Sequence, residues 1–186
     1  FDGLASAAKW MRGGVEPYPG CDDDARAIDT RLGVPSAVAA RFDRAIRARF
    51  RDQALMGMVV RHLATGLSDA SLWVPIDEAG AQIAPLEERS RKIARRYEKV
   101  DPDLAIVDAS DHAEGPYDKT LLLLLGQERA RAACVIDGDN VTFAARFDSG
   151  INFLTLFGLS GGMPTVLSLQ RSRLREALGK LGVADA

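Results

Sequence analysis

The sequence predicts an α/β protein with two lobes. Short apolar segments between turn residues, such as residues 104–107 and 132–136, are typical of buried strands. Longer segments with apolar residues three and four positions apart, such as residues 35–50, are typical of helices. A charge-rich helix expected over residues 85–100 separates two such regions. We therefore expect an N-terminal α/β lobe, a linker helix and a small C-terminal α/β lobe, over residues 1–82, 83–100 and 101–186 respectively.

Composition narrows the class of protein. The 186 residues are 47% hydrophobic and 27% charged, which is ordinary for a globular chain, and the net charge of −2 gives no overall field for nucleic acid or membranes. The longest apolar run, residues 121–125, is too short to span a bilayer, so no membrane partner is expected. Cys21 and Cys134 provide no disulfide framework, which favours a reducing, cytoplasmic location. Because the chain starts at Phe1 without Met, we expect a fragment of a longer product. Internal segments of that product could also be missing from the sequence.

The N-terminal lobe is expected to begin with a helix over residues 1–11. Asp2 just ahead of it could bind a metal, although an N-cap role is favoured by spacing alone. Residues 27–30 could form a strand that ends in Asp29, at the position where open α/β sheets place ligands. The three carboxylates of residues 22–24 are more typical of a solvated loop or a helix start than of a cation site. His62, near the end of a second helix over residues 53–63, is interpreted as a cap-region residue.

The linker helix and the start of the C-terminal lobe are rich in charge. Six basic residues crowd the linker helix, two of them in favourable i, i+4 pairs with Glu87 and Glu88, so a solvated face is favoured over a phosphate-binding one. The group Asp108, Asp111 and His112 follows the strand over residues 104–107 and is an incomplete metal site without distant partners.

The stretch over residues 141–169 organises the C-terminal lobe. We expect a strand after the turn signal of residues 138–140, a break at residues 148–150, a short helix over 152–157, a glycine turn and a strand over 166–169, with a closing helix over 172–181. A strand that ends on Arg146 and returns through Gly161 and Gly162 could hold an anion on backbone N–H groups beside a cation. On the residues alone, a tight connection with an exposed arginine is the favoured alternative.

This order of elements resembles the substrate-binding domain (DHHA1) of the DHH phosphoesterases. In that family an arginine-containing segment after a strand and a GGGH-type loop after a short helix hold the substrate phosphate; the matching positions are Arg146 and residues 160–163. The first residues, 1–7, resemble the D-x-D-G-x-x-S-A motif, with Asp2 as its second aspartate, and Asp29 would be the second motif. The chain contains no Asp-His-His, and Met163 replaces the loop histidine.

The resemblance implies metal-dependent hydrolysis of a phosphodiester or phosphoanhydride of nucleotide, oligonucleotide or polyphosphate type. Asp2 and Asp29 would bind Mn²⁺ or Mg²⁺, and Arg146, Ser149, Gly161 and Gly162 would bind the substrate phosphate. The partner would be a phosphorylated small molecule or a short nucleic acid, with a homodimer as an option. Two alternatives stay open: a non-catalytic relative that binds a phosphorylated ligand, and an unrelated α/β protein whose glycines and carboxylates serve turns and caps.

Overall fold

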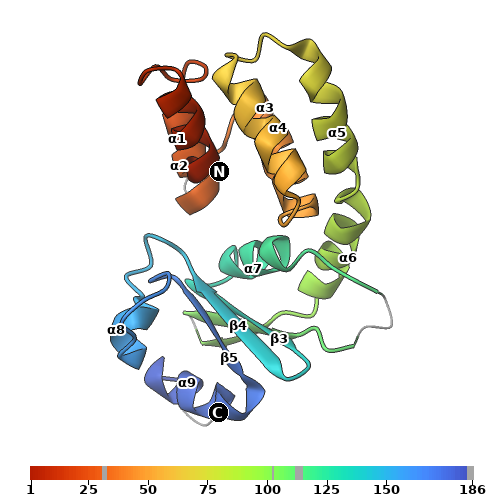
Figure 1. Ribbon diagram of the computed structural model, residues 1–186. Helices are drawn as coiled ribbons and strands as arrows, with labels where there is room; N and C mark the ends of the chain where they lie inside the picture. Colours follow the sequence, from red (N-terminus) through yellow and green to blue (C-terminus); the bar gives the residue numbers. More distant parts are fainter. Residues whose placement is uncertain (31–32, 102, 112–114, 184–186) are drawn as a thin grey trace. The chain divides into compact units, whose positions relative to one another are not determined.

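The computed structural model describes residues 1–30, 33–101, 103–111 and 115–183 (Figure 1). The chain divides into two compact units, Phe1–Pro85 and Leu86–Ala186. No helix in the described ranges is both long enough and apolar enough to cross a bilayer. The mixed α/β class predicted from the sequence is confirmed, but its helices and strands are distributed differently from the prediction.

All the regular elements of the first unit are helices within the described residues. Its elements are α1 Asp2–Met11, α2 Cys21–Thr30, α3 Ala37–Ala48, α4 Gln53–Ala64, the short 3₁₀ helix η1 Ala70–Leu72, and α5 Trp73–Ala81. The α/β character expected for this lobe is therefore wrong for the described part. The strand expected over residues 27–30 is the end of α2, because three aspartates in its first turn favour the positive end of the helix dipole and because Cys21, Ala25 and Ile28 form one buried face.

Helix packing around Phe42 forms the core of this unit. Phe42 of α3 is fully buried and lies in one cluster with Val59 and Leu63 of α4 and Ile76 of α5. Side chains cap two of these helices: Ser36 accepts a hydrogen bond from the N–H of residue 39 at the start of α3, and Asp52 caps α4 in the same way.

Helix α5 packs against the core of this unit. Ile76 and Ala79, three positions apart, are both buried against the core. Gly80 lies within α5, and a Cβ there would be in ordinary van der Waals contact, 3.6 Å, with the backbone nitrogen of Ala45 in α3.

The second unit contains a five-stranded sheet in the order β1-β2-β3-β4-β5. Its strands are β1 Glu98–Asp101, β2 Leu104–Asp108, β3 Ala132–Asp137, β4 Asn140–Ala145 and β5 Val166–Gln170. Neighbouring strands are antiparallel except β2 and β3, which are parallel and are connected through α7 Lys119–Gln127. The predicted hairpin is confirmed: Asp137 pairs with Asn140, and Gly138 has a φ of 57°.

The charged helix ahead of the sheet is shorter than expected. Helix α6 is Ala84–Ala94, so the helix predicted to reach residue 100 ends six residues earlier and the chain continues into β1. The helix ends in a turn in which the N–H groups of Arg95, Arg96 and Tyr97 bond to carbonyl oxygens three residues earlier, and Tyr97 is buried in one cluster with Ile93 and Ala94.

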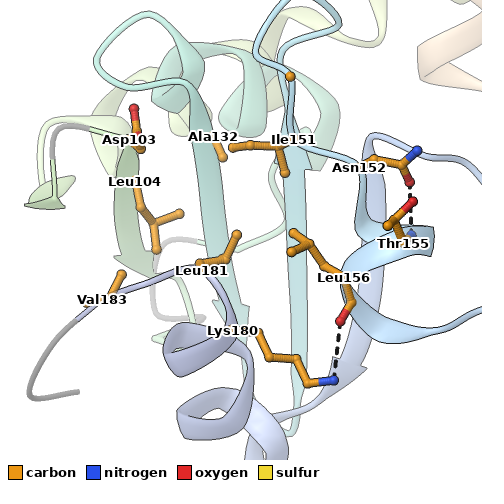
Figure 2. A pocket seen from close by; sticks show the side chains of 11 residues that line it. Asp103, Leu104, Ala132, Ile151, Asn152, Thr155, Leu156, Lys180, Leu181 and Val183 are labelled. Carbon is orange, nitrogen blue, oxygen red and sulfur yellow. Dashed lines mark hydrogen bonds between the residues drawn. The ribbon is translucent and has the colours of Figure 1, made fainter.

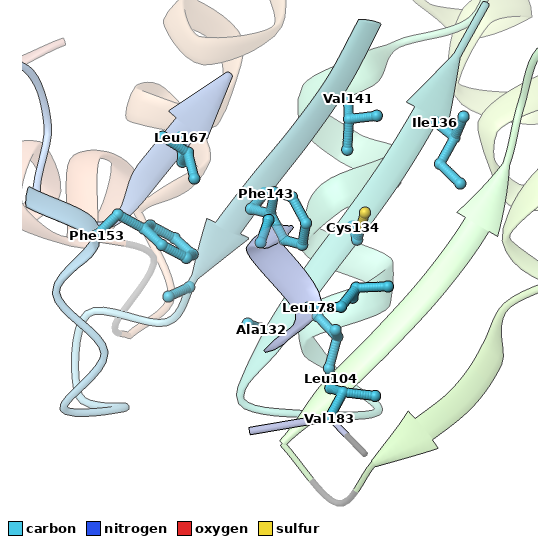
Figure 3. Close-up of a cluster of buried hydrophobic side chains, with 12 residues drawn as sticks. Leu104, Ala132, Cys134, Ile136, Val141, Phe143, Phe153, Leu167, Leu178 and Val183 are labelled. Carbon is cyan, nitrogen blue, oxygen red and sulfur yellow. The ribbon is translucent and has the colours of Figure 1, made fainter. Parts of the chain in front are cut away.

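Helices cover both faces of the sheet (Figure 1). Alternation along β3 divides its side chains: Ala133 and Val135 lie on the face covered by α6 and α7, whereas Cys134 faces α8 Phe153–Phe157 and α9 Leu174–Lys180. Figure 3 shows the apolar cluster on the face covered by α8 and α9, with Phe143 of β4 near its centre. The 3₁₀ helix η3 Arg171–Arg173 leads from β5 into α9.

Helix α7 lies unusually close to the sheet at Gly126. An ideal Cβ at this position would be 2.6 Å from both the Cβ of Ala133 and the Cζ of Tyr97. The Tyr97 hydroxyl donates a hydrogen bond of 2.9 Å to the carbonyl oxygen of Leu122, one turn earlier in the helix. Only glycine therefore fits between this aromatic ring and β3.

Candidate functional site

The two predicted metal-binding aspartates lie next to each other at the start of α1. The Asp29 carboxylate accepts a hydrogen bond of 2.7 Å from the backbone N–H of Asp2 and one of 2.9 Å from the amine of Phe1. Asp29 therefore caps α1 from a distant part of the chain. The N-cap role favoured for Asp2 is wrong, because Phe1 occupies the N-cap position and Asp2 lies inside the first turn.

Asp2 and Asp29 provide the type of ligand that a hard cation prefers, but the described residues around them provide too few ligands. Carboxylate oxygens are the ligands that Mn²⁺ and Mg²⁺ prefer. Within the described ranges, however, no group of three or more His, Cys, Asp or Glu side chains is placed to hold a metal ion. The described residues therefore do not supply a complete metal site around Asp2 and Asp29.

The acidic segment at the start of α2 has a structural role. Asp24 is only 8% exposed and accepts hydrogen bonds from the Tyr18 hydroxyl (2.8 Å) and from both the amide and the hydroxyl of Ser36 (2.6 Å each). Burial works to raise the pKa of Asp24, but the Ser36 and Tyr18 hydrogen bonds outweigh it and lower the pKa. Asp24 thus connects α2 to the beginning of α3.

His62 is part of the core rather than a helix cap. Its ring is fully buried, with centroids 6.0 Å from Phe42 and 4.4 Å from Trp73, and neither ring nitrogen has a hydrogen-bond partner in the described part of the chain. Burial lowers the pKa of His62 and thus keeps the ring neutral, as an apolar environment requires.

The group after β2 also has a structural role. Asp108 accepts hydrogen bonds of 2.9 Å from the Ser110 amide and from Arg171 at the end of β5. Burial works to raise the pKa of Asp108, and the contacts with Ser110 and Arg171 lower it overall. His112, the third member of the group singled out in the sequence, lies outside the described residues.

The predicted phosphate-binding segment begins where β4 ends. The guanidinium of Arg146 donates to both carboxylate oxygens of Asp148, at 3.0 and 2.8 Å, and this hydrogen-bonded pairing raises the pKa of Arg146. Ser149 is buried; its amide donates to the Arg146 carbonyl oxygen (3.0 Å), and its hydroxyl accepts from the N–H of Ile151 (3.1 Å). The segment is therefore a tight, internally bonded turn that presents an exposed arginine.

The glycine loop returns to the same end of the sheet. Gly162 has a φ of 118°, a backbone conformation that favours glycine, and a side chain at Gly161 would meet no atom within 4 Å. Beyond the loop, the carbonyl oxygen of Thr165 accepts a hydrogen bond of 2.8 Å from the N–H of Ala145, the residue before Arg146. The structure thus brings the arginine segment and the end of the glycine loop to the same end of β4 and β5.

A pocket of about 340 Å³ lies beside the turn, between the sheet and helices α8 and α9 (Figure 2). Its polar lining includes Asp103, Asn152, Thr155 and Lys180. Arg131 connects two sides of the pocket, because it donates hydrogen bonds to the carboxylate of Asp103 (3.0 Å) and to the carbonyl oxygen of Ser149 in the turn. Sequence reasoning missed this pocket, since its lining residues come from five separate segments and share no local pattern.

Comparison with known proteins supports the fold. No family model and no curated protein matches the sequence. Among solved structures, the pGpG-specific phosphodiesterase PggH from Vibrio cholerae superposes with a TM-score of 0.61 and 15% identity over 88% of this chain and 66% of its own. The exonuclease RecJ bound to manganese superposes with a TM-score of 0.51 and 15% identity over 99% of this chain.

These similarities confirm, at the level of the fold, the predicted likeness to DHH/DHHA1 phosphoesterases. The chain spans just under two thirds of the PggH structure and about half, 48%, of the RecJ structure.

Proposed function

We propose that the chain is a phosphoesterase that hydrolyses a phosphodiester or phosphoanhydride of nucleotide, oligonucleotide or polyphosphate type. The observation that carries the proposal is the meeting of Asp29 with the start of α1. The two aspartates that the resemblance assigns to a metal centre come from different helices, and the Asp29 carboxylate binds the backbone N–H of Asp2 at the N-terminus of α1. The fold shared with a phosphodiesterase and an exonuclease supports the same activity.

Phosphate binding is assigned to the end of the sheet where β4 stops. In the pair with Asp148, Arg146 uses Nε and Nη2, which leaves Nη1 to face a phosphate oxygen. The exposed backbone of Gly161 and Gly162 allows a phosphate to approach N–H groups without a side chain in the way. Ser149 orders this turn through its hydroxyl, which is bonded to the N–H of residue 151.

A divalent ion would be held by Asp2 and Asp29, and Mn²⁺ or Mg²⁺ suits their oxygens. When bound, such an ion lowers the pKa of a water molecule and offsets charge on phosphoryl oxygens. Because the described residues provide only two ligands, we assign no catalytic step to the ion. We also propose that the protein is cytoplasmic and that it can form a homodimer.

The test is hydrolysis of bis-p-nitrophenyl phosphate by the full chain, with and without Mn²⁺. Asp29→Asn keeps a hydrogen-bond acceptor for α1 but removes the charge, and Asp29→Ala removes both. Asp23→Ala, on an 83% exposed side chain of the same helix, is the matched control. We expect Mn²⁺-dependent turnover that both Asp29 variants lose and the control keeps. Absence of turnover with any metal, together with no Mn²⁺ binding by calorimetry, would refute the proposal.

The second candidate function is binding of a phosphorylated ligand without hydrolysis. The shortage of metal ligands in the described ranges favours it, and so does the replacement of the expected loop histidine by Met163, which is 60% exposed. Binding of a nucleotide that depends on Arg146, in a protein with no metal-dependent turnover, would establish this alternative.

A further inference from the structure

Three arginines surround a small hollow on the other side of the sheet from the pocket described above. Arg91 comes from the last turn of α6, Arg95 from the turn after that helix, and Arg129 from the turn after α7. The hollow has a volume of about 150 Å³. Glu128 is the single acidic residue in its lining.

The arrangement places like charges together without described partners to neutralise them. Arg91 and Arg95 are four positions apart, a spacing at which like charges on a helix repel each other. Neither has a hydrogen bond or an ion pair among the described contacts, whereas Lys92 on the neighbouring face is paired with Glu88 at 3.2 Å.

The geometry suits a phosphate group. Arg129 is held in place by a hydrogen bond of 3.3 Å from Nη1 to the carbonyl oxygen of Tyr97, so its guanidinium is oriented before any ligand arrives. Planar guanidinium groups bind phosphate through paired N–H donors. The volume is well below the roughly 300–1,000 Å³ of pockets that enclose a drug-sized ligand, so a single oxyanion fits and the rest of the ligand lies outside.

We propose that Arg91, Arg95 and Arg129 form a phosphate-binding site, separate from the one assigned to Arg146. The phosphate is either a free ion or one unit of an oligonucleotide backbone. Both sites lie at the end of the sheet where β3 starts, because the carbonyl oxygen of Arg131, two residues after Arg129, accepts a hydrogen bond of 2.9 Å from the N–H of Arg146. The site requires no metal and does not depend on hydrolytic activity.

The test is metal-free binding by the full chain, with inorganic phosphate measured by calorimetry and a labelled single-stranded oligothymidylate measured by fluorescence anisotropy over a salt series. Arg91→Gln and Arg95→Gln remove lining arginines. Arg96→Gln is the matched control. This substitution removes the same charge, and Arg96 is an exposed residue next to Arg95 in the sequence that does not line the hollow. Arg146→Gln monitors the other site.

We expect both lining variants to weaken binding and the control to leave it unchanged. For the oligonucleotide, each lost phosphate contact should reduce the slope of log K against log salt by about 0.7. The ligand whose binding is lost more completely identifies the source of the phosphate. Equal weakening by the lining and control variants, loss confined to Arg146→Gln, or no binding of either ligand at low salt would each overturn the site. Asp29→Ala should not change any of these affinities, so failure of the phosphoesterase proposal is distinguishable.

Discussion

Replacing Gly126 by alanine sets two opposing effects against each other. Alanine is favoured over glycine in a helix by up to about 1 kcal/mol, and Gly126 lies in the last turn of α7. Against this, the new methyl group would lie 2.6 Å from the Cβ of Ala133 and from the ring of Tyr97, and backbone or buried ring must move to admit it. Overpacking of this kind costs roughly 1–3 kcal/mol. Displacing the ring also threatens the hydrogen bond from its hydroxyl to Leu122, worth about 1 kcal/mol.

The sum predicts that Gly126→Ala lowers the free energy of unfolding by about 1–3 kcal/mol. The measurement is urea denaturation followed by far-UV circular dichroism, with amide exchange of β3 as the local readout, since both tryptophans belong to the first unit. Gly179→Ala is the control, because this glycine lies in α9 of the same unit and an added Cβ meets nothing within 4 Å. Equal stabilisation by both substitutions would refute the close packing of α7 on the sheet.

Three further predictions concern charge and burial. Burial lowers the pKa of His62 below its ordinary value near 6.5, so the unfolded chain binds the extra proton first, and the free energy of unfolding should fall as pH drops below 6.5, by at most about 1.4 kcal/mol per pH unit. Urea midpoints, measured by tryptophan fluorescence at pH 5.5 and 7.5, should differ in the wild-type chain and converge in His62→Leu. The same pH dependence in both proteins would contradict this prediction. Asp24→Ala leaves the Ser36 amide and hydroxyl without their acceptor and should cost about 1–3 kcal/mol in the same assay, whereas a neutral effect would exclude a structural role. Asp148→Asn frees the Arg146 guanidinium and should strengthen nucleotide binding several-fold by calorimetry, while Arg146→Gln should weaken it; no change in either variant would remove Arg146 from the phosphate site.

The second unit could be predicted well from the sequence because its signals are local. The apolar runs at residues 104–107 and 132–136 and the turn at Gly138 each identify their own element, and the order of elements then indicated the DHHA1-like fold. In the first unit the helices predicted over residues 1–11, 35–50 and 53–63 are present, but residues 27–30 were predicted as a strand. A segment of four residues fits a strand and a helix equally, and the acidic first turn and buried face of α2 favour the helix.

In the candidate site, too, the features that depend on local sequence could be predicted and those that depend on tertiary structure could not. The resemblance assigned Asp2 and Asp29 to one metal centre, which stays a prediction. The structure places the Asp29 carboxylate on the backbone N–H of Asp2, and this capping contact depends on the tertiary position of α2. Likewise, the arginine at 146 was recognisable from its strand, but its pairing with Asp148 and the role of Arg131 beneath the turn depend on side-chain directions that no spacing rule encodes.

The strand order of the second unit has a consequence for its synthesis and folding. Because every strand pairs with the next one along the chain, the sheet can grow one strand at a time without waiting for distant segments, which keeps loop-closure costs low. Helix α7 is made early and covers its face before the sheet is complete. The opposite face, with Phe143 at its centre, waits for α8 and α9 in the last part of the chain. A nascent chain that stalls before α9 is therefore expected to expose this apolar surface, which favours aggregation.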